Sequence, residues 1–232
     1  MLGNRSLDRA SGNQGLSERQ PEAASFQRRL LFVVLVAVML AIGVTAVMAP
    51  RWARPDVGDP PMVLGQAPDF SLVNRDGRTL TNADLLGSPW VADFIFTRCA
   101  ISCPRMTSRM LQLGRLMPAD LNTARVSFSV DPEYDTQEVL QTYAESWDIE
   151  DSRWFFMTGD REILKSIVMD GFKLAVEMNP PPGTASPEEP ILHSTRFVLV
   201  DSAGAIRGYY DVVQGGELER LIGDLRALQA ES

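Results

Sequence analysis

One uninterrupted apolar segment near the N-terminus limits what this chain can become more than any other feature. Residues 30–49 read LLFVVLVAVMLAIGVTAVMA, 20 residues without one charged side chain. About 20 apolar residues are what a helix needs to cross the hydrocarbon core of a bilayer. Core helices of soluble proteins seldom lack every charge for so long. We therefore predict a single transmembrane helix over residues 30–49.

A cleaved signal peptide is the main alternative to an anchor. Residues 47–49 (Val-Met-Ala) loosely resemble a small-residue cleavage site. However, the apolar run is longer than a usual signal-peptide core, and Pro50 directly follows the candidate bond. A mitochondrial presequence is disfavoured because Asp8, Glu18 and Glu22 interrupt a segment that should be poor in acids. We favour an uncleaved anchor.

Positive charges beside the segment set its expected orientation. Three arginines precede it closely and two follow it: Arg19, Arg28, Arg29, Arg51 and Arg54. This excess directs the N-terminus to the cytoplasm. We therefore expect a single-pass protein of a bacterial inner (cytoplasmic) membrane, with its C-terminal domain in the periplasm. Cysteine pairs can be oxidised in that compartment.

The rest of the chain divides by composition. Residues 1–29 are expected to be a disordered cytoplasmic segment, and residues 50–61, with four prolines, a stiff linker. Residues 62–232 suit one compact domain. From residue 50 onward there are 17 basic and 27 acidic side chains, a net charge of −10, which argues against nucleic-acid binding. Two cysteines exclude a disulfide-rich scaffold, and a single histidine excludes a site with several histidines.

Apolar periodicity predicts strands that alternate with helices, and hence an α/β core with helices on both faces of a sheet. We expect a hairpin at 70–81, a buried strand at 90–97, a helix at 105–117, a strand at 125–130, a helix to about 147, a strand at 154–157, a helix at 161–169, a strand at 173–176, a hairpin at 196–210 and a helix at 217–228. The methionines of the 105–117 helix have core spacing, and we interpret them as core.

The two cysteines, Cys99 and Cys103, lie between the buried strand and the following helix. Pro104 is suited to the first helical position, which would place Cys103 at the N-cap and Cys99 one loop turn earlier. The positive end of the helix dipole would then favour thiolates. Such a pair can close reversibly into a disulfide or bind a soft metal such as Cu(I). The alternative is an inert disulfide or two core cysteines.

His193 is the only histidine and ends a segment, 178–190, that contains five prolines. A lone histidine is more often structural or exposed than a ligand. With two thiolates it would complete a three-coordinate soft site, but its proximity to them does not follow from periodicity.

Other polar residues have simpler interpretations. Asp131 and Asp135 end a strand at the edge where α/β proteins gather function, yet turn and helix capping explains them better, with Asp135 capping a helix that has Glu138 three residues on. Glu188 and Glu189 are interpreted as solvated loop charges. We find neither a phosphate-binding glycine loop nor a defensible Ser-His-Asp arrangement.

Three segments together carry a family resemblance: Phe96-Thr97-x-Cys99-x₃-Cys103-Pro104, residues 129–136 (SVDPEYDT), and His193-Ser194-Thr195 leading into residues 197–201 (FVLVD). On these segments the chain resembles the Sco/SenC proteins over about residues 62–228. They are membrane-anchored, thioredoxin-like copper proteins involved in assembling cytochrome c oxidase.

The resemblance implies a thioredoxin-like fold with an added N-terminal hairpin and a long loop, preceded by the transmembrane helix. It implies Cys99, Cys103 and His193 as copper ligands. The expected function is a metallochaperone that delivers copper to the binuclear copper centre of the oxidase subunit. The alternative is an enzyme, a membrane-tethered thiol–disulfide oxidoreductase that uses Cys99 and Cys103 as its catalytic redox pair. A copper or redox sensor acting through a partner is a third possibility.

The chain departs from the family pattern at three places. Residues 100–102 are Ala-Ile-Ser where the family commonly has Pro-Asp-Ile/Val between the cysteines. Arg98 replaces a histidine before the first cysteine, and Leu192 replaces an aspartate before the histidine. A lost acid and a gained arginine would change the basicity of the thiolates and the surface offered to a partner.

Overall fold

A computed structural model describes residues 21–52, 58–117, 121–177 and 191–231, and for residues 21–25, 45–52 and 192–193 it describes only the backbone. The chain forms two compact units, residues 1–55 and 56–232. The predicted N-terminal segment, linker and proline-rich loop fall wholly or partly outside the described residues.

The first unit contains helix α1 (Pro21–Trp52). Proline suits a helix start because the first backbone N–H groups have no acceptor within the helix. Within α1, Phe26–Val44 is long and apolar enough to cross a membrane, and its side chains are exposed throughout. The predicted apolar helix is therefore present. It begins at Pro21, nine residues before the predicted start at residue 30.

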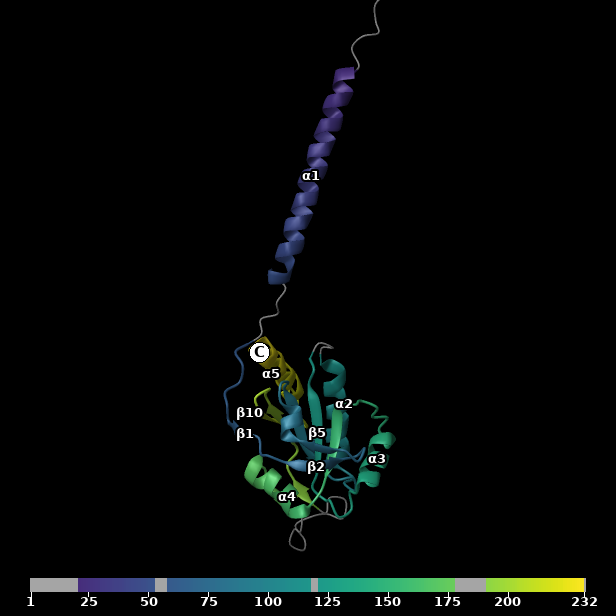
Figure 1. Ribbon diagram of the computed structural model, residues 1–232, viewed down its shortest axis with the longest axis vertical. Coiled ribbons are helices and arrows are strands. Elements are labelled where there is room, and N and C mark those ends of the chain that lie inside the picture. Colours follow the sequence, from purple (N-terminus) through teal and green to yellow (C-terminus); the bar gives the residue numbers. More distant parts are fainter. Residues whose placement is uncertain (1–20, 53–57, 118–120, 178–190, 232) are drawn as a thin grey trace, which may run out of the picture. The chain divides into compact units, whose positions relative to one another are not determined.

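The second unit is built on an eight-stranded mixed sheet (Figure 1). Its order across the sheet is β1 (Gly65–Gln66), β10 (Ala205–Asp211), β9 (Arg196–Val200), β4 (Trp90–Ile95), β5 (Ala124–Ser129), β6 (Trp154–Thr158), β2 (Ser71–Asn74) and β3 (Thr79–Thr81). Strands β4, β5 and β6 are parallel, and the other pairings are antiparallel. The two predicted hairpins are confirmed as β2–β3 and β9–β10.

One face of the central strands is aromatic. Phe94 of β4 stacks on Phe128 of β5 with ring centroids 5.6 Å apart, and Phe172 meets Phe94 edge-on at 5.3 Å. Trp90 and Phe70 close the same cluster. Alternate residues of a strand point to opposite faces, so one run of apolar residues fills the core on both sides. All six residues of β4 are buried, as predicted for a central strand.

Helices cover both faces of the sheet, as predicted. The opposite face from the aromatic cluster packs against α2 (Ser102–Leu116), with α3 (Gln137–Ser146) and α5 (Glu217–Glu231) beside it. Thr107 Oγ1 of α2 lies 2.7 Å from the Tyr143 hydroxyl of α3. Met106 and Met110 are fully buried, which confirms them as core residues.

The remaining elements connect or extend the sheet: the 3-10 turn η1 (Asn82–Leu85), α4 (Arg161–Ser166), the π-helical turn η2 (Ile167–Gly171), and a separate two-stranded sheet of β7 (Val176–Glu177) and β8 (Leu192–His193). The strand predicted at 173–176 is therefore shorter and starts later.

Helix α3 corrects the predicted cap. Its N-cap is Thr136, whose side chain accepts a hydrogen bond from the Val139 N–H, and the first helical residue is Gln137. Asp135 lies before the helix and turns inward instead. The sequence offers two adjacent capping residues, and burial of Asp135 against β4 and β5 decides between them.

Candidate thiol and metal site

The two cysteines meet where β4 runs into α2. Cys99 lies in the loop between these elements, and Cys103 lies in the first turn of α2. The backbone N–H of Cys103 donates to Cys99 Sγ at 3.3 Å, and the Ser102 hydroxyl lies 3.1 Å from the same sulfur. Both residues are present as thiols. The loop therefore brings the pair together, as their position at a strand-to-helix junction predicts.

The start of α2 differs from the prediction by two residues. Ile101 is the N-cap, so Cys103 is the second helical residue and Pro104 the third. Proline fits there because none of the first N–H groups of a helix has an acceptor within the helix. The same property leaves the Cys103 N–H available for the Cys99 sulfur.

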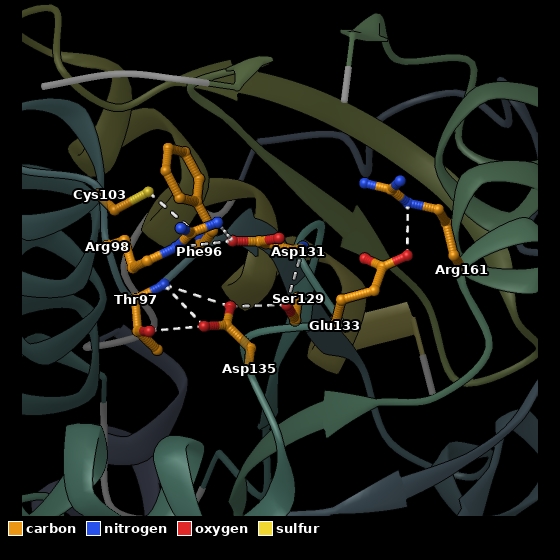
Figure 2. Close-up of polar contacts among 9 residues, drawn as sticks. All are labelled: Phe96, Thr97, Arg98, Cys103, Ser129, Asp131, Glu133, Asp135 and Arg161. Carbon is orange, nitrogen blue, oxygen red and sulfur yellow. Dashed lines mark hydrogen bonds and ion pairs between the residues drawn. The ribbon is translucent and has the colours of Figure 1, made fainter. Parts of the chain in front are cut away.

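The two thiols lie in different surroundings. Cys99 is 5% exposed and Cys103 only 1%, and the Phe96 N–H donates to Cys103 Sγ at 3.4 Å (Figure 2). Burial raises the pKa of the Cys103 thiol, neighbouring Cys99 raises it further, and the Phe96 N–H acts in the opposite direction. At Cys103 the helix dipole therefore favours the thiolate, whereas burial favours the neutral thiol.

A buried carboxylate links the ends of β4 and β5. Asp135 accepts hydrogen bonds from the Thr97 N–H and hydroxyl, and from the Ser129 hydroxyl at 2.7 Å (Figure 2). Ser129 Oγ in turn accepts from the Asp131 N–H at 3.0 Å. Burial raises the pKa of Asp135 despite these donors, and Asp131 adds to the rise. This network fixes the backbone that leads from β4 into the cysteine loop.

Arg98 lies beside Cys99 in the chain and is held from two sides. Its guanidinium forms an ion pair with Asp131, with Nε 3.0 Å from Oδ2 (Figure 2). The guanidinium also lies over the Tyr134 ring, 4.4 Å from its centroid. The hydrogen bond to Asp131 raises the pKa of Arg98. Nearby, Glu133 pairs with Arg161 of α4 at 2.9 Å. An arginine held by an ion pair and an aromatic ring therefore stands next to the cysteine loop.

The predicted site residues have different outcomes. Cys99 and Cys103 come together. The backbone of His193 lies in β8, opposite Val176, and its side chain is outside the described residues, as are Glu188 and Glu189. Among the side chains that the structure describes, no three His, Cys, Asp or Glu residues form a metal-binding group.

Sequence reasoning did not predict that Thr97, Arg98, Ser129 and Tyr134 form one network, although it expected Arg98 to affect the cysteines. It also misinterpreted two aspartates. Asp131 and Asp135 were expected to be caps, and instead they accept hydrogen bonds from the other members. Their position in the chain could have indicated the network. Thr97 comes shortly after β4 and Ser129 ends β5, and the carboxyl ends of these two adjacent parallel strands lie at the same edge of the sheet.

This arrangement allows two kinds of chemistry. Two adjacent thiols can exchange with another disulfide, or they can lose their protons and bind a soft metal ion. The near-complete burial of Cys103 means that any partner must approach from the side of Cys99. The structure therefore supports a pair of buried thiols, of which Cys99 is slightly the more exposed.

Comparisons with known proteins agree on one family. Residues 64–229 match the model of the SCO1/SenC protein family. The SCO1 protein homolog of Bacillus subtilis is 31% identical over 160 residues, which cover 68% of this chain and 80% of that protein.

Solved structures agree on the fold. BsSco, described as having a disulfide switch and as a member of the Sco family of cytochrome c oxidase assembly proteins, has 29% identity and a TM-score of 0.66 over 75% of this chain and 100% of that one. ScoI of Bradyrhizobium japonicum, solved with copper bound, has 21% identity and a TM-score of 0.58 over 70% of this chain and 99% of that one. The predicted thioredoxin-like α/β fold is confirmed.

Proposed function

This chain belongs to the SCO1/SenC family, and from that membership we propose that it is a copper metallochaperone. It binds one copper ion through Cys99, Cys103 and His193 and delivers it to the binuclear copper centre of cytochrome c oxidase during assembly. The observation that carries the proposal is the dithiol at the junction of β4 and α2, where the Cys103 N–H donates to Cys99 Sγ at 3.3 Å.

The donor set fits copper as the cargo. Thiolate sulfur and imidazole nitrogen are the ligands that Cu(I) prefers among protein groups. Metal binding requires deprotonated cysteines, so loading releases their protons. Copper would also place a positive charge beside the Cys103 thiolate, which burial disfavours. Three ligands leave an open position, through which a ligand of the receiving protein can enter before one of the original ligands leaves.

The relatives support copper and the client. ScoI of Bradyrhizobium japonicum was solved with copper bound, and BsSco is described as a member of a family of cytochrome c oxidase assembly proteins. The apolar helix Phe26–Val44 supports an anchor in a bacterial inner membrane. With arginines before it, the anchor would leave the copper domain in the periplasm.

Competition titration with a Cu(I)-specific chelator tests the proposed ligands. We expect one tight copper per wild-type chain and a loss of at least tenfold in affinity for Cys99→Ser, Cys103→Ser and His193→Ala. Ser194→Ala is the matched control and should bind copper as wild type does. If His193→Ala retains wild-type affinity and stoichiometry, the proposal of three ligands is wrong.

The closeness of the two cysteines also favours a second function, thiol–disulfide exchange. Cys99 is the more exposed thiol and has hydrogen-bond partners in Ser102 and the Cys103 N–H, so we assign it as the attacking sulfur. Its thiolate attacks a client disulfide and releases one client thiolate. Cys103 then displaces the second client sulfur and closes the Cys99–Cys103 disulfide. Two electrons pass to the client, whose two sulfurs leave as thiols after taking up two protons.

The two functions depend differently on His193. Exchange with a client disulfide requires both cysteines, so Cys99→Ser should abolish it. His193→Ala should change its rate little, because no step of the exchange uses the imidazole. If His193→Ala slows reduction as strongly as it weakens copper binding, the two functions share the histidine, and an exchange mechanism that uses the two cysteines alone is wrong.

A further inference from the structure

Helix α2 carries a charge opposite to that of its domain. Residues 94–119 contain four arginines and neither aspartate nor glutamate, whereas residues 50–232 have a net charge of −10. Three of these arginines, Arg105, Arg109 and Arg115, lie on α2 itself. The helix that starts at the cysteine pair is thus a positive stripe on a negative domain.

Within the described part of the chain, the arginines of α2 are also without ion pairs, a property they share in this domain with Arg75, Arg153, Arg196 and Arg226. Elsewhere in the domain six arginines form ion pairs with carboxylates: Arg78, Arg98, Arg125, Arg161, Arg207 and Arg220. Among the side chains that the structure describes, no carboxylate lies within ion-pair distance of Arg105, Arg109 or Arg115. Arg109 Nη1 donates instead to Gln112 Oε1, at 2.8 Å. Their charges are therefore available to an outside partner.

Arg105 and Arg109 border a hollow on the helix. The hollow has a volume of about 320 Å³ and is lined by Pro104, Arg105, Ser108, Arg109, Gln112 and Val213. Residues four apart on a helix share a face, so the two arginines lie one turn apart along its rim. We name this surface, Arg105 and Arg109 with the four other lining residues, the arginine face.

The arginine face begins at the N-terminal end of α2, next to the cysteine loop in the chain. Pro104 and Arg105 directly follow Cys103, and Ile101, in the loop between the cysteines, is 48% exposed. Arginine is among the residues that most often contribute strongly to protein interfaces. Any protein that exchanges copper or a disulfide at Cys99 must come within contact distance of this loop, and it would then cover the start of α2.

We propose that the arginine face docks an acidic segment of the client protein. This deepens the proposed function and rests on it. The charge pattern selects an acidic partner, since a basic one would be attracted by the rest of the domain and repelled at the site of exchange. Complementary charge accelerates encounter and rejects wrong partners, and both effects weaken as salt is added. An anionic lipid surface is the competing occupant. We favour protein, because the face begins at the end of α2 that follows the cysteine loop, where a client must bind.

The test is a competition between two disulfide peptides that differ only in charge. Both carry the same cyclic disulfide core, one flanked by glutamates and the other by lysines, and both are reduced by the full chain in a neutral detergent. We expect the wild type to reduce the glutamate peptide about tenfold faster than the lysine peptide at low salt, with the ratio falling toward one as salt rises. In Arg105→Glu/Arg109→Glu the ratio should fall below one.

A charge-matched variant separates position from net charge. Lys165→Glu/Arg226→Glu makes the same total change at exposed residues of α4 and α5, and it should keep most of the wild-type ratio. The proposal is wrong if the ratio of the two reduction rates falls as far in this control as in Arg105→Glu/Arg109→Glu. It is also wrong if Arg105→Glu/Arg109→Glu keeps the wild-type ratio. Each result is a ratio within one variant, so a general change in thiol reactivity cancels.

Two further measurements keep the inference distinct from the proposed function. Failure of the wild type to bind Cu(I) and to reduce a neutral dipyridyl disulfide would overturn the proposed function itself. Wild-type reactivity with that reagent but no preference between the peptides would overturn only the docking proposal. The lipid alternative is tested in nanodiscs, by comparing the rate of disulfide reduction in phosphatidylglycerol with that in phosphatidylcholine. If the rate is lower in phosphatidylglycerol, if Arg105→Glu/Arg109→Glu abolishes this difference and if the wild type shows no peptide preference, the arginine face binds lipid. That result would also overturn the docking proposal.

Discussion

Two buried charged residues lie toward opposite ends of strand β5, Arg125 at its start and Asp135 in the loop after its end. Their surroundings differ. At the start of β5, Arg125 forms an ion pair with Asp151, donates to the Met110 carbonyl of α2 at 3.0 Å and lies over the Trp154 ring at 4.6 Å. Beyond its end, Asp135 accepts hydrogen bonds from Thr97 and Ser129. Among the described side chains, no cation lies within ion-pair distance of Asp135.

The pKa shifts of the two carboxylates follow this difference. Burial acts to raise the pKa of Asp151, but the Arg153 N–H and the Arg125 guanidinium outweigh it, and the pKa is lowered. At Asp135 burial outweighs the neutral donors, and the pKa is raised. Burial also lowers the pKa of Arg125, but its carboxylate partner, its bond to the Met110 carbonyl and the Trp154 ring compensate, so we expect the start of β5 to stabilise the fold. The end near the cysteines retains a carboxylate that is unfavourable when ionised. Proteins tolerate such costs mainly at functional sites.

Removing Arg125 should have the largest effect on stability. Arg125→Ala removes the ion pair, a buried hydrogen bond and the packing on Trp154, and we expect a loss of about 3 kcal/mol in the free energy of unfolding. Copper stoichiometry should not change. Urea denaturation measures the loss, with exposed Arg153→Ala as the control at less than about 1 kcal/mol. Equal losses for the two variants would show that the start of β5 is not the stabilising end.

Ser129→Ala should have the next largest effect. It leaves Asp135 with one donor fewer and the Asp131 N–H without its acceptor, so we expect a loss of about 1–2 kcal/mol. The same denaturation experiment measures it. In addition, the coupling between Ser129→Ala and Asp135→Asn should exceed that between Ser129→Ala and Arg153→Ala, which lie in separate networks. Additive losses in both cycles would contradict a network at this end.

The pH dependence of stability should have opposite signs at the two ends. Because the native pKa of Asp135 is raised, its contribution is present at low pH and is lost as pH rises from about 3.9 toward the native value. The free energy of unfolding of wild type minus Asp135→Asn should therefore fall with rising pH. For Asp151→Asn the difference should rise with pH, since a lowered pKa stabilises above the unfolded value. The same sign for both variants would refute the comparison.

Arg98 should contribute least to stability, although it lies nearest the cysteines. Its side chain is about half exposed, so water can replace much of its contact with the buried Asp131, and Arg98→Gln should cost no more than about 1 kcal/mol. Arg78→Gln, which breaks a pair exposed on both sides, is the surface control and should cost less than Arg98→Gln. A loss at Arg98 comparable to that of Arg125→Ala would mean that the ion pair supports the fold rather than the cysteine loop.

Local patterns predicted most of the fold. The apolar run of α1, the buried strand β4 and both hairpins follow from composition and periodicity alone, and the junction of β4 with α2 placed the two cysteines together. Patterns of this kind depend on neighbouring residues, so a single sequence contains them.

The remaining features depend on contacts between distant residues. The pairing of β1 with β10 joins residues 65–66 to 205–206, and nothing in either segment specifies the other. Asp135 fits a capping pattern that Thr136 satisfies equally well, and only the approach of Thr97 and Ser129 makes it a buried acceptor. Proximity of His193 to the cysteines is of the same kind and stays a prediction from family resemblance.

X-ray absorption of the full chain loaded with one equivalent of Cu(I) would decide whether Cys99, Cys103 and His193 together bind the metal. We expect two sulfur ligands and one nitrogen ligand, with the nitrogen lost in His193→Ala and one sulfur lost in either Cys→Ser variant. A copper site with two sulfurs and a nitrogen that persists in His193→Ala, or with fewer than two sulfurs in the wild type, would contradict the three-ligand site.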